Sequence, residues 1–220
     1  MQVVVPFAAE TPKTRLEDVL TRSERARFAR AMLADVLAAI DATGHVPTIL
    51  STAPLSFEDE LESVPPSISV DVDDRPLTEA VDARLPEAGD DPVAVVMADL
   101  ALATPAALES LFGVSADVAI APGRGGGTNA LVVRHPSFRV DYHGTSYLDH
   151  REIAREADAS LEAVDSFRLG TDVDEPADLV EVLIHGTARA PACLRELGFD
   201  LEHDEGRVGV TRTEESTNES

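Results

Sequence analysis

Short apolar runs and segments of helical periodicity alternate along the chain. Residues 2–7, 46–50 and 92–98 are apolar runs of strand length with several β-branched side chains, and they predict buried strands. Between the first two runs, apolar positions from Phe28 to Ile40 recur at helical spacing, behind a capping box that starts at Thr21. This order of strand, helix and strand predicts an α/β fold with a mostly parallel central sheet flanked by helices.

The remaining pattern extends this order to about residue 212. Further strands are expected at residues 67–72, 117–121, 130–133 and 138–142, the last two as a hairpin-like excursion. Further helices are expected at 77–85, from Thr104-Pro105 onward, at 146–157 and at 177–184. Residues 1–212 are therefore predicted to form one domain, and the polar residues 213–220 a disordered acidic tail.

Acidic residues outnumber basic ones, at 41 against 18, which gives a formal net charge of −23. A nucleic acid or an anionic membrane requires a basic surface, so neither is expected as a partner. Hydrophobic residues still make up 44% of the chain, enough for a packed core. Because the sequence has no signal-peptide pattern and no apolar run of membrane-spanning length, we expect a cytoplasmic protein, and the charge favours a high-salt organism.

Lys13 is the only lysine in the chain, since the other 17 of the 18 basic residues are arginines. It lies shortly after the first predicted strand and two residues before Arg15. A compact ammonium group on a flexible stem suits phosphate binding, so Lys13 and Arg15 are candidates for holding the phosphates of a nucleotide. The alternative is that one lysine persists by chance in an exposed loop.

Three aspartates are candidates for binding a cation. Asp99 ends the most apolar strand, where open α/β sheets bind ligands, and a carboxylate buried there needs a cation or hydrogen bonds. Asp172 and Asp174 are two residues apart, so in an extended segment both would face the same side. Magnesium binds one or two carboxylates together with phosphate oxygens. As alternatives, Asp99 could cap the following turn, and Asp174 or Glu175 the helix that begins at Pro176.

A glycine-rich segment is a candidate for binding an anion or the edge of a base. Gly125, Gly126 and Gly127 let the backbone approach a ligand closely, and Thr128 and Asn129 add hydrogen-bonding side chains. Flexible turns have the same composition, so the triplet alone is weak evidence. Neither a dinucleotide fingerprint nor a Walker loop is present.

A second segment, Gly144 to Ser146, precedes a predicted helix. It could present backbone N–H groups and hydroxyls to a phosphate, and an ordinary helix cap would explain it equally well. The neighbouring His143 and His150 are expected to be structural rather than metal ligands. The sequence offers no persuasive Ser-His-Asp arrangement.

These segments together resemble one known family, the 2-phospho-L-lactate guanylyltransferases. The resemblance runs in order from about residue 2 to 210, and the glycine-threonine-asparagine and aspartate-valine-aspartate segments are its fairly specific parts. It is carried by Val5-Pro6-Phe7, Pro12-Lys13-Thr14-Arg15-Leu16, Met97-Ala98-Asp99-Leu100, Gly125-Gly126-Gly127-Thr128-Asn129-Ala130-Leu131, Gly144-Thr145-Ser146 with His150, Gly170-Thr171-Asp172-Val173-Asp174-Glu175-Pro176-Ala177-Asp178-Leu179 and Gly206-Arg207-Val208-Gly209.

The resemblance implies a Rossmann-like nucleotidyltransferase domain with a glycosyltransferase-A-type core. It implies that GTP and (2S)-2-phospholactate are condensed to lactyl-2-diphospho-5′-guanosine and pyrophosphate, a step in the biosynthesis of coenzyme F-420. Close relatives use phosphoenolpyruvate instead. A homodimer would fit the family, although no residue in this chain indicates one.

The resemblance also implies roles for the candidate residues. The triphosphate would be contacted by Lys13 and Arg15, and the nucleotide by Gly125, Gly126, Gly127 and Asn129. Magnesium would be held by Asp99, Asp172 and Asp174, so the catalytic set would be Lys13, Arg15 and Asp99. The phosphorylated acid would be bound by Thr128, Gly144 and Ser146.

One departure from the family concerns the charge at the triphosphate. Many members carry a lysine directly after the proline-aromatic pair, where this chain has Ala8. Arg124 could supply a replacement charge. The transfer itself needs no general base, because the attacking phosphate oxygen is already ionised at neutral pH, so alignment and charge neutralisation remain as the tasks of the protein.

Two other functions are compatible with these residues. The first is a guanylyl- or cytidylyltransferase acting on phosphoenolpyruvate or another phosphorylated small molecule, which the acceptor that raises pyrophosphate release would identify. The second is a nucleotide-binding regulatory module without catalysis. The three aspartates argue against it, because a binding protein could dispense with a costly cluster of carboxylates.

The charge of −23 predicts that stability depends on salt. In dilute buffer the repulsion between acidic side chains is unscreened, so the fold is expected to be lost, whereas molar salt should restore it. Circular dichroism of the same sample in dilute buffer and in molar KCl measures the difference. Full stability without salt would contradict the prediction.

Overall fold

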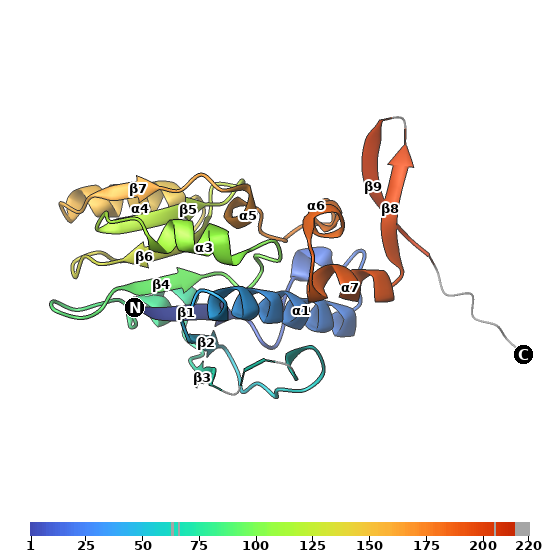
Figure 1. Ribbon diagram of the computed structural model, residues 1–220, viewed down its shortest axis with the longest axis horizontal. Helices are drawn as coiled ribbons and strands as arrows, with labels where there is room; N and C mark the ends of the chain where they lie inside the picture. Colours follow the sequence, from blue (N-terminus) through green and yellow to red (C-terminus); the bar gives the residue numbers. More distant parts are fainter. Residues whose placement is uncertain (63, 66, 205, 214–220) are drawn as a thin grey trace, which may run out of the picture.

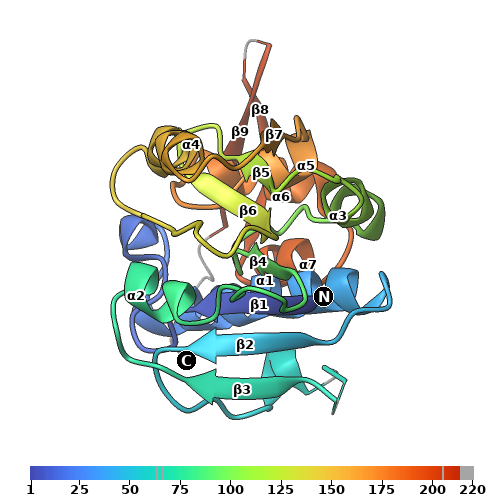
Figure 2. The same ribbon diagram turned by 90° about the vertical axis from the view of Figure 1, so that its left-hand side faces the viewer.

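A seven-stranded sheet lies at the centre of the computed structural model, which describes residues 1–62, 64–65, 67–204 and 206–213 (Figure 1). Its strands are β1 (Gln2–Phe7), β2 (Pro47–Ser51), β3 (Ser69–Val72), β4 (Val93–Val96), β5 (Val118–Pro122), β6 (Thr128–Val133) and β7 (Leu161–Ala163). They pair in the order β3-β2-β1-β4-β6-β5-β7, which Figure 2 shows from bottom to top.

The strands of this sheet share one direction, with β6 as the exception. β1 pairs in parallel with β2 and β4, β2 pairs in parallel with β3, and β5 with β7, whereas β6 is antiparallel to β4 and β5. The carboxyl ends of the parallel strands and the amino end of β6 therefore lie at the same edge. Loops from distant parts of the sequence can form one site there.

Helices cover both faces of the sheet, because successive side chains of each strand point to opposite faces. The helical elements are α1 (Arg22–Asp41), α2 (Leu77–Asp82), α3 (Pro105–Phe112), α4 (Ser146–Glu156), α5 (Phe167–Gly170), α6 (Asp178–His185), α7 (Arg189–Glu196) and the 3-10 turns η1 (Thr14–Leu16) and η2 (Asp59–Leu61). Val3 and Val5 belong to the core cluster with α1, α3, α6 and α7, and Val4 belongs to the cluster with α2 and α4.

Helix α1 begins and packs as its sequence predicts. The Thr21 N–H donates to Glu24 Oε2 at 2.8 Å, and the Glu24 N–H donates to Thr21 Oγ1 at 3.4 Å, so the predicted capping box is present. Phe28, Met32 and the other apolar positions of the helix are buried against the sheet. Burial of each large apolar side chain stabilises the fold by about 1.5–3 kcal/mol.

Most predicted elements are confirmed. Strands β1 to β5 and helices α1, α3, α4 and α6 lie within two residues of the predicted bounds, and α2 ends at Asp82 rather than at residue 85. The predicted parallel sheet with helical layers is the observed architecture.

The predicted hairpin of residues 130–133 and 138–142 is wrong. Strand β6 lies between β4 and β5, and residues 138–142 form no strand. Phe138 and Val140 are buried in a hydrophobic cluster, which gives this segment the alternating pattern of a strand. Its backbone N–H groups are bound by side chains instead: Val140 donates to Asp82 Oδ1 at 2.8 Å and Tyr142 to Thr78 Oγ1 at 3.1 Å.

A second, two-stranded sheet of β8 (Phe199–Asp204) and β9 (Arg207–Arg212) projects beyond α7, away from the central sheet (Figure 1). This hairpin, β7 and α5 are absent from the predicted elements. Strand β7 has only three residues, too few to establish a strand period. Apolar Phe199 and Leu201 alternate with acidic residues ahead of a turn at Gly206, a pattern that indicates a hairpin. Arg212 anchors the hairpin, since its Nη1 donates to the Val19 carbonyl at 2.8 Å.

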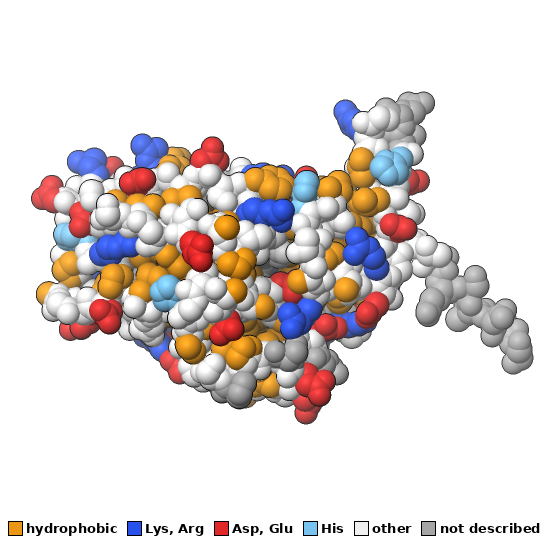
Figure 3. All heavy atoms as spheres, in the orientation of Figure 1, with side chains coloured by type: hydrophobic (Ala, Val, Ile, Leu, Met, Phe, Trp, Pro, Cys, Tyr) orange, Lys and Arg blue, Asp and Glu red, His pale blue; other side chains and the backbone are white. Residues whose placement is uncertain are grey.

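On the face drawn in Figure 3, acidic and arginine side chains are interspersed, and no basic patch gathers there. Within the described ranges, no helix has both the length and the apolar character needed to cross a membrane. Residues 214–220, the larger part of the predicted tail, lie outside the described residues.

Candidate functional site

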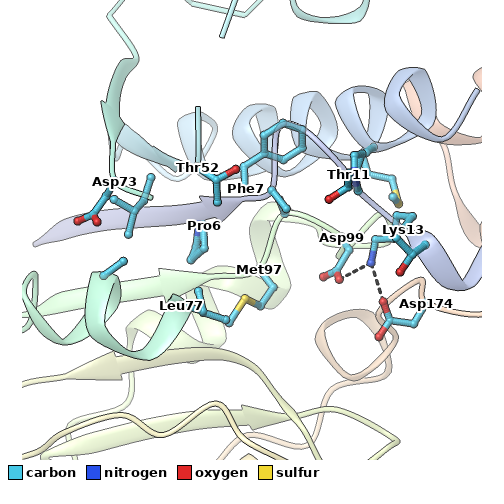
Figure 4. Close-up of a pocket in the computed structure, with 18 of the residues that line it drawn as sticks. Pro6, Phe7, Thr11, Lys13, Thr52, Asp73, Leu77, Met97, Asp99 and Asp174 are labelled. Carbon is cyan, nitrogen blue, oxygen red and sulfur yellow. Dashed lines mark hydrogen bonds and ion pairs between the residues drawn. The ribbon is translucent and has the colours of Figure 1, made fainter. Parts of the chain in front are cut away.

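A cavity of about 450 Å³ lies where β1, β2, β3 and β4 end (Figure 4). Its walls come from the loop that follows β1, from Thr52 after β2, from Asp73 after β3 and from Met97 to Asp99 after β4. Lys13 and Asp174 complete one end of it. The parallel arrangement of these strands is what brings four separate loops to one cavity.

Lys13 binds two of the predicted metal ligands. Its Nζ donates to Asp99 Oδ2 at 2.6 Å and to Asp174 Oδ1 at 2.8 Å, and its side chain is only 11% exposed. Burial acts to lower the pKa of Lys13, but the charges of Asp99 and Asp174 and their hydrogen bonds outweigh it and raise the pKa above its ordinary value. The ammonium is therefore charged at neutral pH.

The backbone of Lys13 has φ 54° and ψ 48°, in the left-handed region that non-glycine residues avoid. Holding a lysine in this conformation costs on the order of 1–2 kcal/mol. Such strain persists where the surrounding structure stabilises it, and it concentrates at functional sites. The conformation and the ion pairs both argue against the interpretation of Lys13 as a chance residue in an exposed loop.

Asp99 retains an acceptor that needs a partner. Its Oδ2 accepts from Lys13, but its Oδ1 is buried without a hydrogen bond from any described residue. A buried unpaired carboxylate oxygen is costly, so the atom fits a cation or a hydrogen-bond donor that arrives with a ligand. The alternative role of Asp99 as a cap of the following turn is not found, because its Oδ2 accepts from Lys13 and its Oδ1 accepts no hydrogen bond from the described residues.

Asp172 is held differently from the other two aspartates. Asn129 Nδ2 donates to Asp172 Oδ1 at 3.0 Å and to the Leu169 carbonyl at 2.9 Å, so Asn129 fastens this segment to the sheet. Burial raises the pKa of Asp172, the hydrogen bond from Asn129 opposes the rise, and the charges of Asp99 and Asp174 add to it. The three carboxylates therefore lie within electrostatic reach of one another.

The three aspartates do not form a metal site in the present arrangement. No three His, Cys, Asp or Glu side chains among the described residues are placed to hold one ion together. Lys13 lies between Asp99 and Asp174, where a cation would be bound. The magnesium site stays a prediction. The unpaired Asp99 Oδ1 and the neighbouring carboxylates are the kind of ligands that magnesium binds.

Helix α6 has Ala177 as its N-cap and no side-chain cap, so neither Asp174 nor Glu175 caps it as the alternative proposed. Asp178 Oδ2 instead accepts from the N–H groups of Asp174 at 3.0 Å and Glu175 at 2.8 Å, which stabilises the turn before the helix. Arg124 Nη2 donates to Asp178 Oδ1 at 3.1 Å and so lies at this turn. Arg15 is 69% exposed, with its Nη1 at 3.6 Å from Asp174 Oδ2. The Asp174 carboxylate remains available to a cation.

The glycine-rich segment does not line the cavity. Residues 123–127 form the turn between β5 and β6, in which the Gly123 N–H donates to the Gly127 carbonyl at 2.9 Å and Gly126 has φ 84°. The Tyr147 N–H donates to the Gly126 carbonyl at 3.1 Å, which places the turn beside the start of α4. Gly125, Gly126, Gly127 and Asn129 are not among the residues around the Lys13 cavity.

The predicted acid-binding residues lie close together at the start of α4. Ser146 is the first residue of this helix, Gly144 precedes it with φ 55°, and Thr128 starts β6. Thr128 Oγ1 lies 2.8 Å from Nδ1 of the buried His150 on α4. The side chain of Thr145 makes no cap hydrogen bond, so the N–H groups of the first turn are not bound by it.

The hydrogen bonds of His150 determine its tautomer. The Asp141 N–H donates to Nε2 at 2.9 Å, so Nε2 is the acceptor and Nδ1 carries the hydrogen. Nδ1–H then donates to Thr128 Oγ1, and the Thr128 hydroxyl keeps its own hydrogen for another acceptor. Burial, opposed by the charge of Asp141, lowers the pKa of His150 to about 4. His150 therefore joins Thr128 at the start of β6 to the backbone of Asp141.

The cavity-wall residues that sequence reasoning missed include Thr52, Asp73, Arg75 and Leu77. Thr52 and Asp73 directly follow strands that the sequence predicts correctly. The rule that ligands bind beyond the carboxyl ends of parallel strands would have identified them.

Comparison with known proteins shows the family to which the chain is similar. A family model described as "Guanylyl transferase CofC like" matches residues 1–215. A 2-phospho-L-lactate guanylyltransferase of Haloterrigena turkmenica is 70% identical over 228 residues, covering 98% of this chain and 99% of its own. Proteins of the same name are 60% identical in Halorubrum lacusprofundi (96% and 100% covered) and 45% identical in Methanosphaerula palustris (96% and 97% covered).

Solved structures share the fold at low identity. A structure from Desulfovibrio desulfuricans, described as a nucleotide-diphospho-sugar transferase, is 19% identical, with a TM-score of 0.72 and 89% and 95% of the two chains covered. A nucleotidyl transferase from Methanothermobacter is 16% identical, with a TM-score of 0.54 and 89% and 99% covered. The α/β fold is therefore that of nucleotidyltransferases.

The buried His150 predicts an acid-sensitive contribution to stability. Its pKa is lower in the folded chain than its ordinary value of about 6.5, so the unfolded chain binds the proton more readily. The contribution of His150 to the free energy of unfolding is complete above pH 6.5, and it falls by up to about 1.4 kcal/mol per pH unit as the pH drops towards 4. Denaturant unfolding in molar salt across this range measures it.

The His150→Gln variant should lose this part of the pH dependence, even where it is less stable overall. His203→Gln is the matched control, because His203 is exposed on β8 and its replacement should leave the slope unchanged. An unaltered slope in His150→Gln would contradict the assignment.

Proposed function

Because this chain belongs to the family of CofC-like guanylyl transferases, we propose that it condenses GTP with (2S)-2-phospholactate to lactyl-2-diphospho-5′-guanosine and pyrophosphate, as a step in the biosynthesis of coenzyme F-420. The observation that carries the proposal is the ion-paired Lys13 at the end of a cavity of nucleotide size, in a chain 70% identical to a relative of that name. The acceptor, the purine and the cation are part of the proposal.

The reaction sets an electrostatic task for the protein. A phosphate oxygen of the acid attacks the α-phosphorus of the nucleotide, one phosphorus–oxygen bond forms, and the bond to the departing pyrophosphate breaks. The nucleophile is ionised at neutral pH, so no residue must remove a proton. The protein has to bring two polyanions together and align them, which requires local positive charge on a chain whose net charge is −23.

Lys13 is proposed to exchange its partners during this reaction. In the free protein its ammonium neutralises Asp99 and Asp174, which would otherwise repel each other. Magnesium, when bound, would be held by Asp99 and Asp174 beside Asp172 and would neutralise charge on the phosphates. Lys13 and Arg15 are then free to contact the triphosphate, for which the compact ammonium is suited.

The acid is proposed to bind at the start of α4. The Thr128 hydroxyl has a hydrogen to donate, because His150 already donates to its oxygen. Gly144 and Ser146, on either side of the N-cap residue Thr145, add backbone N–H groups at the start of α4, where the helix dipole favours an anion. Both subsites lie at the same edge of the sheet, which fits in-line transfer between them.

The setting of the enzyme belongs to the same proposal. The charge of −23 and the acidic surface suit a cytoplasm of high salt concentration. We also propose a homodimer, which light scattering in molar salt would identify by its mass.

The function is tested by magnesium-dependent release of pyrophosphate in molar salt. GTP is offered with 2-phospholactate, with phosphoenolpyruvate and with neither acid, and release is expected to be highest with 2-phospholactate. Asp99→Asn should lower turnover on the order of a hundredfold or more, since a charge that binds the cation is removed. Asp90→Asn, on an exposed loop before β4 at the opposite edge of the sheet, is the control. Folded protein that releases no pyrophosphate with any acid would contradict the function.

Replacing Lys13 is expected to have two effects of opposite sign. Lys13→Met removes the ammonium that competes with a cation. The affinity of the free protein for Mn²⁺ should therefore rise at least about tenfold. The same variant should raise KM for GTP, because a phosphate contact is lost. Electron paramagnetic resonance of free Mn²⁺ and steady-state kinetics measure the two effects. Arg15→Met is the control for Mn²⁺, since Arg15 is 3.6 Å from Asp174 and mostly exposed. Unchanged Mn²⁺ affinity and GTP kinetics in Lys13→Met would contradict the proposed exchange.

A further inference from the structure

The cavity continues well beyond Lys13, to a second charged end. Figure 4 shows Asp73 at the opposite end of the cavity from Lys13, Asp99 and Asp174. Asp73 and Arg75 lie in the loop between β3 and α2, and both line the cavity. A ligand whose phosphates are held by Lys13 would place its other end against this loop.

The dimensions of the sheet fit a whole nucleotide. Asp73 directly follows β3, and Asp99 follows β4, with β2 and β1 between them. Three spacings between adjacent strands, at about 4.8 Å each, separate the two ends by roughly 14 Å. This length accommodates a base and ribose in addition to phosphates, whereas a phosphorylated acid alone would leave the far end empty.

The walls between the two ends are largely apolar. Leu50, Leu77 and Met97 line this part of the cavity. Such side chains suit the flat faces of a base and the carbon skeleton of a ribose. They offer no hydrogen bonds that distinguish one base from another, so discrimination is left to the polar groups at the end of the cavity.

Arg75 is held in one orientation by Asp73. Its Nε donates to Asp73 Oδ1 at 2.9 Å and its Nη2 donates to Asp73 Oδ2 at 2.6 Å. The Arg75 backbone N–H also donates to Asp73 Oδ1, at 3.2 Å. The hydrogen bond from the Arg75 side chain, the largest contribution, lowers the pKa of Asp73 to about 2, so this carboxylate is an ionised anchor at neutral pH.

The anchored guanidinium retains donors for a ligand. An arginine has five N–H donors in a fixed plane, and Asp73 occupies two of them. Nη1 and the second hydrogen of Nη2 have no described acceptor in the protein, although the side chain lines the cavity and is half exposed. Two adjacent donors in one plane are complementary to two adjacent acceptors on a base edge.

We propose that Arg75, oriented by Asp73, reads the purine of the nucleotide by donating to O6 and N7 of guanine. This inference rests on the proposed function and names the residue that selects its nucleotide. Guanine presents these two acceptors side by side, the pattern that arginine binds bidentately. Adenine carries an amino group at the position of O6, which would place a donor against a donor, and pyrimidines have no N7.

The test measures nucleotide binding by titration calorimetry, without turnover, in molar salt. The probes are GTP, inosine triphosphate, 7-deaza-GTP and ATP. Inosine keeps O6 and N7 but lacks the 2-amino group, whereas 7-deazaguanine lacks only N7. The wild-type protein should bind GTP and inosine triphosphate with about equal affinity. It should bind 7-deaza-GTP and ATP at least about tenfold more weakly than GTP.

In Arg75→Ala the affinities for GTP and ATP should differ by only a few-fold, mainly because the affinity for GTP falls about 10- to 100-fold. Arg84→Ala is the matched control, because Arg84 pairs with Asp71, is 3.9 Å from Asp73 and does not line the cavity. Asp73→Asn is a second variant that keeps Arg75 but loosens its anchor, and it should lower the preference for GTP in part. Circular dichroism verifies that each variant is folded.

The outcomes separate this inference from the function on which it rests. If Arg75→Ala keeps the full preference for GTP, or if wild-type protein binds inosine triphosphate as weakly as ATP, Arg75 does not read the base, and the guanylyltransferase can still stand. Folded wild-type protein that binds none of the four nucleotides would overturn both.

Discussion

The ion pairs of Lys13 hold the site together, and the surrounding structure depends on them. One ammonium binds Asp99, 86 residues away in sequence, and Asp174, 161 residues away, at 2.6 and 2.8 Å. Asp99 follows β4, whereas Asp174 lies in the loop between α5 and α6, and a third carboxylate, Asp172, lies within their electrostatic influence. Neighbouring carboxylates repel each other unless a cation lies among them, and in the free protein Lys13 is the cation between Asp99 and Asp174.

Local stability is given up to keep this arrangement. Lys13 adopts a left-handed backbone that costs on the order of 1–2 kcal/mol, and Asp99 keeps a buried oxygen without a partner. Asp178 accepts from the backbone N–H groups of Asp174 and Glu175 in the turn before α6, and the Asp174 carboxylate is left for Lys13. These features are costly in a protein that only has to fold, and they are consistent with a site that exchanges one cation for another when its substrates bind.

The reversed strand β6 divides the edge of the sheet into two sides. Lys13, Asp99 and the cavity that extends to Arg75 belong to the side of β1 to β4, whereas Thr128, Ser146 and His150 belong to β6 and α4. Since β6 starts where its neighbours end, its first residue meets the loops of the parallel strands. The hydrogen bond between His150 and Thr128 fixes the geometry of that second side.

Hydrophobic periodicity, helix caps and the position of Asp99 after a strand are local signals, and they suffice to predict the α/β class, the bounds of most elements and the residue types of the candidate site. Tertiary structure decided the rest. Strand β6 pairs between β4 and β5, and the backbone of residues 138–142 is hydrogen-bonded by side chains instead of by a strand. Lys13 forms ion pairs with two aspartates that are distant in the sequence. The glycine-rich turn does not line the cavity, whereas Asp73 and Arg75 do. Contacts between residues far apart in the chain depend on strand order and direction, which local patterns do not encode.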